Sequence, residues 1–228
     1  MPNIFICVWY FIFLYINKMH NMKHLNTYIT EYIIKKKLDK PIDSEYKYHP
    51  QTKEELIENI KELLDKEETD FNCIDTSAIT DMSFLFLNIN VIIDNIDLSN
   101  WDVSNVTTME GLFNNCKKFN CDLSKWDVSN VKDMSYMFYN CGNFDCDLSK
   151  WDVSKVENMY TMFEGCSKFK GKGLENWNVS KVENISYMFF DCINFDCDLS
   201  NWNVNNVKNM ERMFYNCNLK NTPKWYKE

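Results

Sequence analysis

A phrase of about 25 residues recurs along this sequence. It reads FNCDLSKWDVSNVKDMSYMF from Phe119 to Phe138 and returns in similar form from Phe144 and from Phe195. The repeat tryptophans follow one another at intervals of 25, 25, 26 and 25 residues, at Trp101, Trp126, Trp151, Trp177 and Trp202. A fixed period of this length is typical of folds in which each unit contacts only its neighbours along a stack. The period therefore predicts a solenoid.

Within one unit, two spacings suggest two elements. The WDVS segment alternates apolar and polar residues, which is typical of a short strand. In the unit of Trp126, the apolar residues from Val131 onward then recur at three- and four-residue steps, at Met134, Met137, Phe138 and Cys141, which is typical of a helical stripe about three turns long. The sequence thus predicts an α/β solenoid of about six strand–short-helix units, with the strands of neighbouring units pairing in parallel into a sheet.

Stacking the units aligns equivalent side chains in columns, and these columns are the predicted core. One column is formed by the five repeat tryptophans, and another by the valines two residues after them. The phenylalanine column is Phe113, Phe138, Phe163, Phe189 and Phe214. The unit before Trp177 carries one extra residue at Gly171–Gly173, where glycine can accommodate an insertion.

Eight of the ten cysteines also follow the repeat, in two columns. One column is Cys116, Cys141, Cys166, Cys192 and Cys217, and a second is Cys121, Cys146 and Cys197. Their C-x₄-C spacing differs from the C-x₂-C of zinc sites, and isoleucine replaces cysteine at Ile89 and Ile96. We therefore expect buried free thiols that pack as small apolar side chains. Metal binding and disulfides between adjacent units remain alternatives.

A polar column accompanies the tryptophans, at Asp75, Asp102, Asp127, Asp152, Asn178 and Asn203. It resembles an acidic or calcium-binding ladder, but two members are Asn and no bidentate Glu accompanies it. Glycine (5 residues) and proline (4) are scarce, so turns must rely on Asn, Asp and Ser, which hydrogen-bond nearby backbone. We predict that this column bonds the turn backbone.

Composition and motifs argue against two classes of function. The net charge of -8 opposes binding to a nucleic-acid backbone. The histidines, His20, His24 and His49, all precede the repeats, and no phosphate-binding loop, nucleophile elbow or H-E-x-x-H motif occurs. An enzyme is not expected, and neither a catalytic residue nor a cofactor is assigned.

The sequence before the repeats divides into two parts. Residues 1–21 contain the apolar run Ile4–Ile16. Three interpretations of this run are open: an unusual signal or anchor, a buried segment, or sequence that is not translated. In the third case the true start is Met19 or Met22 rather than Met1. Residues 22–70 form a predicted helical cap region, with one amphipathic helix from His24 to Leu38 and a second from Thr52 to about Glu67. The repeats occupy 71–228.

The repeat pattern resembles a known family. From about Phe71 to Cys217, the repeats follow the pattern F-N/D-x-D-L-S-x-W-D-V-S-x-V-x-x-M-x-x-M-F-x-x-C. This pattern is similar to the BspA-like leucine-rich repeats of bacterial surface proteins, which are also described as a mycoplasma lipoprotein repeat. The resemblance implies a leucine-rich-repeat-like stack and a role in adhesion to host or extracellular-matrix proteins. It supplies no catalytic residues.

We therefore predict a non-enzymatic module that presents an extended sheet face to a protein partner. The predicted contact positions surround the WDVS segments, at Lys125, Asp127, Ser129, Lys150, Asp152 and Ser154. Alternatives are a metal- or redox-responsive protein that uses the cysteine columns, and an intracellular scaffold that binds copies of itself. The resemblance implies the cell surface or secretion, whereas the unpaired thiols suit the cytoplasm. Membrane contact is expected only if residues 4–16 act as a signal or anchor.

Overall fold

The chain divides into two units, Met1–Glu45 and Tyr46–Glu228. The computed structural model describes residues 46–87 and 96–227, which all belong to the second unit. The predictions for the apolar run 4–16, for the helix from His24 to Leu38, for the alternative starts and for position 89 fall outside these residues. No helix in the described residues is long and apolar enough to span a membrane.

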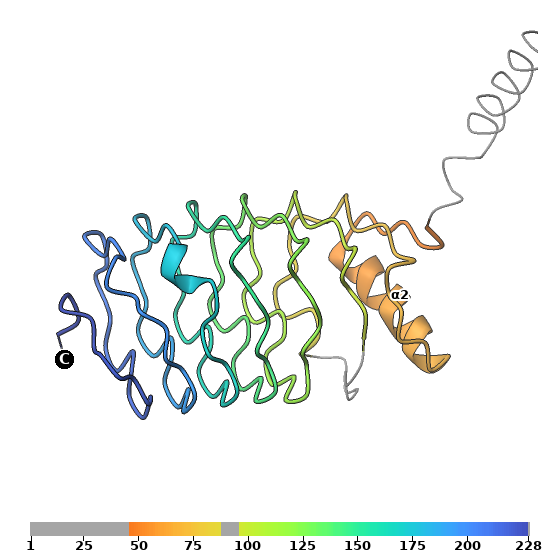
Figure 1. The fold of residues 1–228 in the computed structure, drawn as a ribbon. Coiled ribbons are helices and arrows are strands. Elements are labelled where there is room, and N and C mark those ends of the chain that lie inside the picture. The colour runs from red at the N-terminus through yellow and green to blue at the C-terminus, as the bar shows by residue number, and fades with distance from the viewer. Residues whose placement is uncertain (1–45, 88–95, 228) are drawn as a thin grey trace, which may run out of the picture. The chain divides into compact units, whose positions relative to one another are not determined.

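Helix α2 spans Lys53–Asp65, where the sequence predicts a helix from Thr52 to about Glu67. Thr52 caps it, because its Oγ1 accepts a hydrogen bond from the Glu55 backbone N–H (3.2 Å). The Glu55 carboxylate reaches back and accepts from the Gln51 N–H (2.7 Å), one residue earlier than a capping box would place it. Three residues of its apolar face are fully buried at the N-terminal end of the stacked repeats (Figure 1): Leu56, Ile60 and Leu63.

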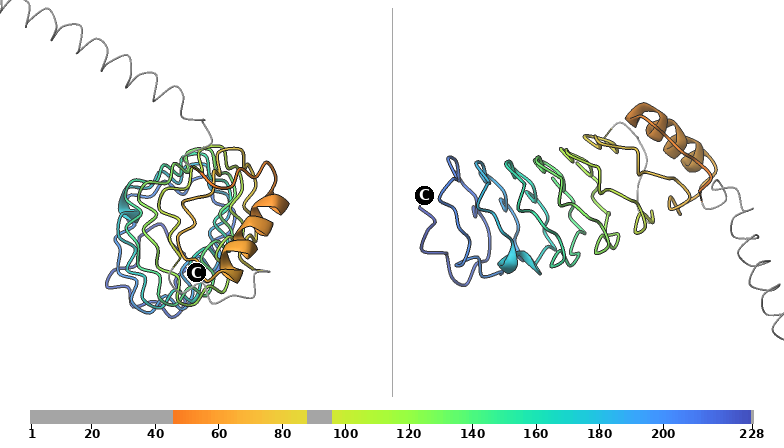
Figure 2. Two further views of the ribbon diagram at one scale, coloured as in Figure 1. Left: turned by 90° about the vertical axis from the view of Figure 1, so that its right-hand side faces the viewer. Right: turned by 90° about the horizontal axis from the view of Figure 1, so that it is seen from above.

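The predicted α/β solenoid of strand–short-helix units is wrong. In the described residues the helices are α2 and the three-residue 3₁₀ helix η2, Leu174–Asn176. The pairing between units is limited there to isolated parallel bridges, so no extended strand or sheet forms. Five of the seven bridges join successive members of one column, which is Asp81, Thr108, Asp133, Asn158, Asn184 and Asn209. The WDVS segments form no strand, and each leads into a turn at its serine. Each unit is a coil built from consecutive turns, and the coils superpose when viewed along the stack (Figure 2).

The segment predicted as a helix shows how this coil is held. Its backbone N–H groups alternate between two partners. Those of Met134 and Tyr136 donate to the next coil, to the carbonyls of Asn158 (3.0 Å) and Tyr160 (2.9 Å), while that of Met137 donates within the coil to Met134 (3.2 Å). Bonds to the residue three positions earlier place apolar side chains at three-residue steps, as a helix does. The sequence spacing therefore fits both structures, and the bonds between coils exclude the helix.

From the coil of Trp101 onward, two residues of each such segment adopt a left-handed backbone, which a helix cannot contain. In one coil they are Tyr136 (φ 56°) and Asn140 (φ 57°). A type II turn requires this conformation at its third residue. For a residue other than glycine, it costs about 1–2 kcal/mol. The hydrogen bonds to the next coil offset this cost. In other coils a glycine avoids it, since Gly111 stands at the position of Tyr136 and Gly165 at the position of Asn140.

Aspartate and asparagine close the remaining turns. Each accepts a hydrogen bond from the backbone N–H two residues ahead, which forms an Asx turn without glycine. The prediction that the polar column bonds the turn backbone is confirmed. The coil around Trp126 has three such pairs, Asp122–Ser124 (2.9 Å), Asp127–Ser129 (3.0 Å) and Asp133–Ser135 (2.8 Å).

The core lies inside the stacked coils. Successive members of the phenylalanine column stack with ring centroids 5.5 Å apart from Phe113 to Phe138, and again from Phe138 to Phe163. Each repeat tryptophan is buried and donates its indole N–H to a backbone carbonyl of the preceding coil, as Trp151 does to Leu123 (3.1 Å). In the last repeat the same columns are only partly buried, at Phe214 and Cys217.

The extra residue before Trp177 lies in the loop that leads into η2. Gly171 and Gly173 both have positive φ, 83° and 95°. A Cβ atom on Gly173 would lie 2.3 Å from the backbone nitrogen of Ser149 in the preceding coil. Glycine is therefore required there both by the backbone conformation and by the close approach of the neighbouring coil.

Candidate functional site

The predicted contact residues flank Trp126 and Trp151 in two successive coils, and we call this surface the WDVS corner. Lys125, Asp127, Lys150 and Asp152 are exposed, and Ser129 and Ser154 are half-buried. The Asp152 carboxylate accepts the Ser154 N–H (3.0 Å), and hydrogen bonds from Ser154 lower the pKa of this carboxyl. The Lys125 ammonium donates to the Asn100 side chain (2.7 Å) in the preceding coil. The corner is therefore accessible, but its carboxylates already hold turns.

A second surface was not predicted from the sequence. Six aromatic side chains form a continuous line across four coils, which we call the aromatic strip. Neighbouring ring centroids are 4.8–6.1 Å apart, and every ring is at least partly exposed. Tyr215 is 53% exposed. The strip consists of Tyr139, Tyr136, Tyr160, Tyr187, Phe190 and Tyr215.

The turns that replace the predicted helix position these rings. The left-handed residue of the first turn, Tyr136, lies between the buried Met134 and Met137, and Tyr139 follows the buried Phe138. The column of Tyr136 varies strongly between coils, whereas the methionine and phenylalanine positions beside it stay apolar. Its members are Phe84, Gly111, Tyr136, Thr161, Tyr187 and Arg212. This contrast between varying and constant positions is the sequence signal that could have located the strip.

Carboxylates flank the strip. Burial raises the pKa of Glu164, and the charge of Asp191 raises it further. Burial also raises the pKa of Glu110, together with the charges of Asp133 and Asp81, while the charge of Lys53 lowers it. The surface is therefore electronegative as well as aromatic.

These surroundings raise the pKa values of two tyrosine hydroxyls in the strip. The pKa of Tyr136 is raised to about 12 by burial, by the neighbouring Tyr160 and by the charges of Glu164 and Glu110. The Tyr187 hydroxyl donates to Glu211 Oε1 (3.0 Å), and this bond raises its pKa. Both hydroxyls therefore stay protonated at neutral pH and act as hydrogen-bond donors.

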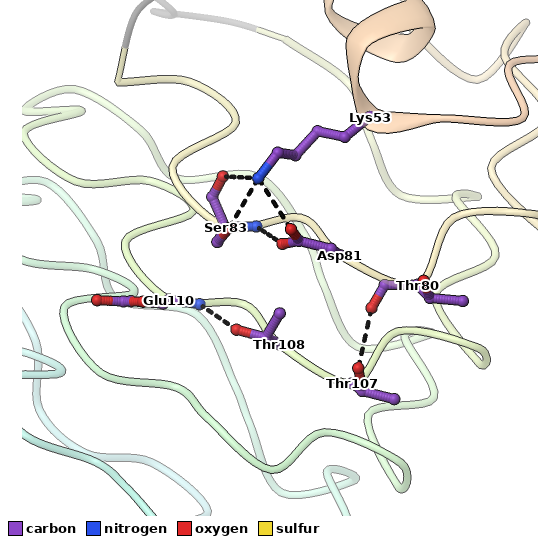
Figure 3. A network of polar contacts seen from close by, with 7 residues as sticks. All are labelled: Lys53, Thr80, Asp81, Ser83, Thr107, Thr108 and Glu110. Carbon is purple, nitrogen blue, oxygen red and sulfur yellow. Dashed lines mark hydrogen bonds and ion pairs between the residues drawn. The ribbon is translucent and has the colours of Figure 1, made fainter.

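Helix α2 supplies a cation at the N-terminal end of this face (Figure 3). The Lys53 ammonium donates to Asp81 Oδ2 (3.0 Å), to the Ser83 hydroxyl (2.8 Å) and to the Ser83 carbonyl (3.1 Å). In the next coil the Glu110 backbone N–H donates to the Thr108 hydroxyl (3.4 Å). Lys53 thus neutralises Asp81, while Glu110 and Glu164 form no ion pair within residues 46–87 and 96–227.

The cysteine columns have the chemistry of packed thiols. The Cys141 Sγ donates to the Phe113 carbonyl (3.0 Å), and Cys166 donates in the same way to Phe138 (3.0 Å). Burial raises the pKa of both thiols well above the usual value. All cysteines of the described residues are free, and these residues contain no group of His, Cys, Asp and Glu side chains arranged to hold a metal ion. Protonated thiols that each donate to a carbonyl are poor nucleophiles and poor metal ligands.

Comparison with known families identifies the repeats. The model of the family described as "Mycoplasma protein of unknown function, DUF285" matches residues 54–175 and 143–226. The chain belongs to this family. No curated protein and no solved structure matches it. The two DUF285 matches together run from the first turn of α2 to Tyr226, so they include the aromatic strip.

Proposed function

We propose that this DUF285 chain is a non-enzymatic protein-binding module whose partner contacts the aromatic strip. The strip itself is the observation that supports the proposal. Its rings lie at outward positions that vary between coils, and they remain partly exposed. Tyrosine and phenylalanine are enriched at protein interfaces, because a rigid ring provides a large contact area at a low cost in conformational entropy. Contiguous exposed apolar patches of this kind mark interaction sites.

The remaining polar groups of each coil support the same function. The aspartates and serines of the WDVS and DLS segments bond their own turns, as Asp127 and Asp122 do. The buried thiols donate to carbonyls of the preceding coil. Because these groups maintain the stack, we assign them no catalytic role. The finer assignment within the family, to BspA-like surface repeats that adhere to host or matrix proteins, is part of this proposal and is based on the WDVSxV and MxxMFxxC pattern.

Site-specific photo-crosslinking tests the proposal. A photoreactive phenylalanine analogue would replace Tyr187 in the strip, Lys150 at the predicted corner, or Glu58 on the exposed side of α2 as a control. We expect a discrete protein adduct from position 187 and none from position 58. An adduct from position 150 alone would move the binding surface to the corner. An adduct that contains only this chain would support the self-associating scaffold, and no adduct at either face would refute a protein-binding role.

A further inference from the structure

Each coil donates a row of backbone N–H groups to the coil that follows it. In the coil of Trp177, four alternate residues donate to carbonyls of the coil of Trp202, at N···O distances of 2.9–3.0 Å. These residues are Ile185, Tyr187, Phe189 and Asp191. The equivalent residues of the preceding coils donate in the same direction. The row of donors therefore faces the C-terminal end of the stack.

The coil of Trp202 has the same row, but the row finds no acceptor. Among residues 46–87 and 96–227, no group accepts a hydrogen bond from the four equivalent backbone N–H groups. They belong to Met210, Arg212, Phe214 and Asn216. The C-terminal end of the described stack therefore presents a row of backbone donors that are open to a partner.

The apolar columns are incompletely covered at the same end. Phe189 is fully buried, whereas its counterpart Phe214 is partly exposed, as is Val207. Trp225 covers one part of this end, since its ring stacks on Trp202 with centroids 6.3 Å apart and takes the place of a further repeat tryptophan. A repeat stack that leaves an apolar end uncapped favours association with another segment.

A second copy of this chain does not fit this end. Helix α2 closes the opposite end of the stack (Figure 1), where Leu56 and Ile60 are buried. The Ser83 carbonyl, at an acceptor position of the first coil, already accepts from the Lys53 ammonium (3.1 Å). Two C-terminal ends do not pair either, because a symmetric contact places the same row on both sides and donors would face donors.

An ordinary extended strand also fits the row poorly. The last coil bends twice, because Arg212 (φ 49°) and Asn216 (φ 54°) have a left-handed backbone. In the preceding coil, Tyr187 (φ 58°) and Asp191 (φ 57°) make the same two bends, and all four bonds form between these matching coils. A segment with the same turns therefore keeps every acceptor in register, whereas a straight strand does not.

We propose that the C-terminal end of the stack binds a segment of a different protein that carries the same repeat pattern. The segment lies parallel to the last coil, offers carbonyls to the four N–H groups, and covers Val207, Met210 and Phe214 with its own apolar side chains. Because Trp225 already supplies the tryptophan, the V-x-x-M-x-x-M-F portion of a repeat is sufficient. In recognition of this kind, backbone bonds provide affinity and side-chain pockets provide specificity. This surface adds to the aromatic strip and does not depend on it.

Fluorescence anisotropy with a labelled repeat peptide tests this inference on the full chain. The probe has the sequence of residues 153–169, VSKVENMYTMFEGCSKF, and is kept under reducing conditions because of its cysteine. A peptide of the same composition in scrambled order is the control. We expect the repeat peptide to bind and the scrambled peptide not to bind. Absence of binding by the repeat peptide, or equal binding by the scrambled one, would overturn the inference.

Two lysine substitutions in the last coil test the location of the peptide. Val207→Lys places a charge under the bound segment and should weaken binding about tenfold or more, because the charge would be buried without a partner. Asn205→Lys adds the same charge at an exposed position of the same coil and should change binding less than about twofold. Equal effects of the two substitutions would contradict binding at this end.

Amide hydrogen exchange on the unmodified chain gives a second measurement that requires no variant. Saturating repeat peptide should slow exchange at Met210, Arg212, Phe214 and Asn216 about tenfold or more, and leave exchange at Asn205 unchanged. Bound peptide without this protection would refute the proposed pairing. A dimer of the full chain that Val207→Lys dissociates would also refute it, because a second copy would then close the end. A photo-adduct from position 187 with no peptide binding would leave the proposed function standing and refute only this second surface.

Discussion

Replacing Trp151 separates two contributions of the tryptophan column to stability. The indole is 4% exposed, stacks on Trp177 with centroids 6.4 Å apart, and donates its N–H to the Leu123 carbonyl (3.1 Å). That carbonyl also accepts the Trp126 backbone N–H (3.1 Å). Trp151→Phe therefore removes one hydrogen bond without leaving the carbonyl unpaired, which costs about 1 kcal/mol. The smaller ring should cost roughly 1 kcal/mol more in buried apolar area.

Trp151→Ala removes the ring itself and leaves a cavity between two coils. We expect a loss of about 3–5 kcal/mol in the free energy of unfolding, because the neighbouring coils are hydrogen-bonded to each other and cannot collapse fully into the space. Trp225 provides the matched control. It makes the same bond, to the Leu199 carbonyl (2.9 Å), but it is only partly buried. Trp225→Ala should cost about half as much.

Urea unfolding, followed by the fluorescence of the remaining tryptophans, measures all three changes. The dependence on urea concentration should stay the same if the variants alter stability alone. A cost for Trp225→Ala equal to that for Trp151→Ala would refute the reasoning, because burial between two coils would then contribute nothing. A Trp151→Phe variant as stable as the unmodified chain would show that the indole N–H bond between coils does not stabilise the fold.

Three further predictions concern the turns, the thiols and the cap. The pKa of Asp122 is lowered by hydrogen bonds from Ser124, so the stability that it contributes is present above the unfolded value of about 3.9 and is lost as pH falls through the folded value. In denaturant titrations, Asp122→Asn should destabilise the chain at pH 7, and this loss should shrink as pH falls below about 3.9. Cys166 is buried, and burial raises the pKa of its thiol, so it should resist iodoacetamide in the native protein and react only after unfolding. Mass spectrometry of the labelled peptides measures this. Labelling of Cys166 as fast as that of the half-buried Cys73 would contradict its assignment as a packed thiol. Lys53→Met should cost roughly 1–3 kcal/mol by leaving Asp81 and Ser83 without their donor, and an unchanged unfolding midpoint would show that this contact does not fasten α2 to the first coil.

Some of the structure could be predicted from local sequence. The capping pattern at Thr52 and the apolar face of Leu56, Ile60 and Leu63 predict α2, because those signals act within one helix. The Asx turns could also be predicted. Glycine and proline are scarce, and an Asp or Asn stands two residues before the turn residue whose backbone N–H it accepts. Both depend on contacts between residues close in the chain.

The candidate site was predicted only in part. The WDVS corner could be located as an exposed position, but the hydrogen bonds that occupy Asp127 and Asp152 became evident only in the structure. The aromatic strip was missed because Tyr136, Tyr160 and Tyr187 lie about one repeat apart in the sequence. Their rings meet only because the coils stack with a fixed register. A list of varying positions does not by itself show which of them are adjacent in space.

The sequence by itself determined the 25-residue period and the side chains that stack in columns, since both follow from the spacing of like residues. The tertiary structure alone decided what the backbone does within each period. Val131, Met134, Met137 and Cys141 suit one face of a helix as well as the inside of consecutive turns. The choice depends on where the backbone N–H groups of Met134 and Tyr136 find acceptors. Those acceptors, Asn158 and Tyr160, lie in the next coil, and so the bonds between coils decided against the helix and brought the outward rings into one line.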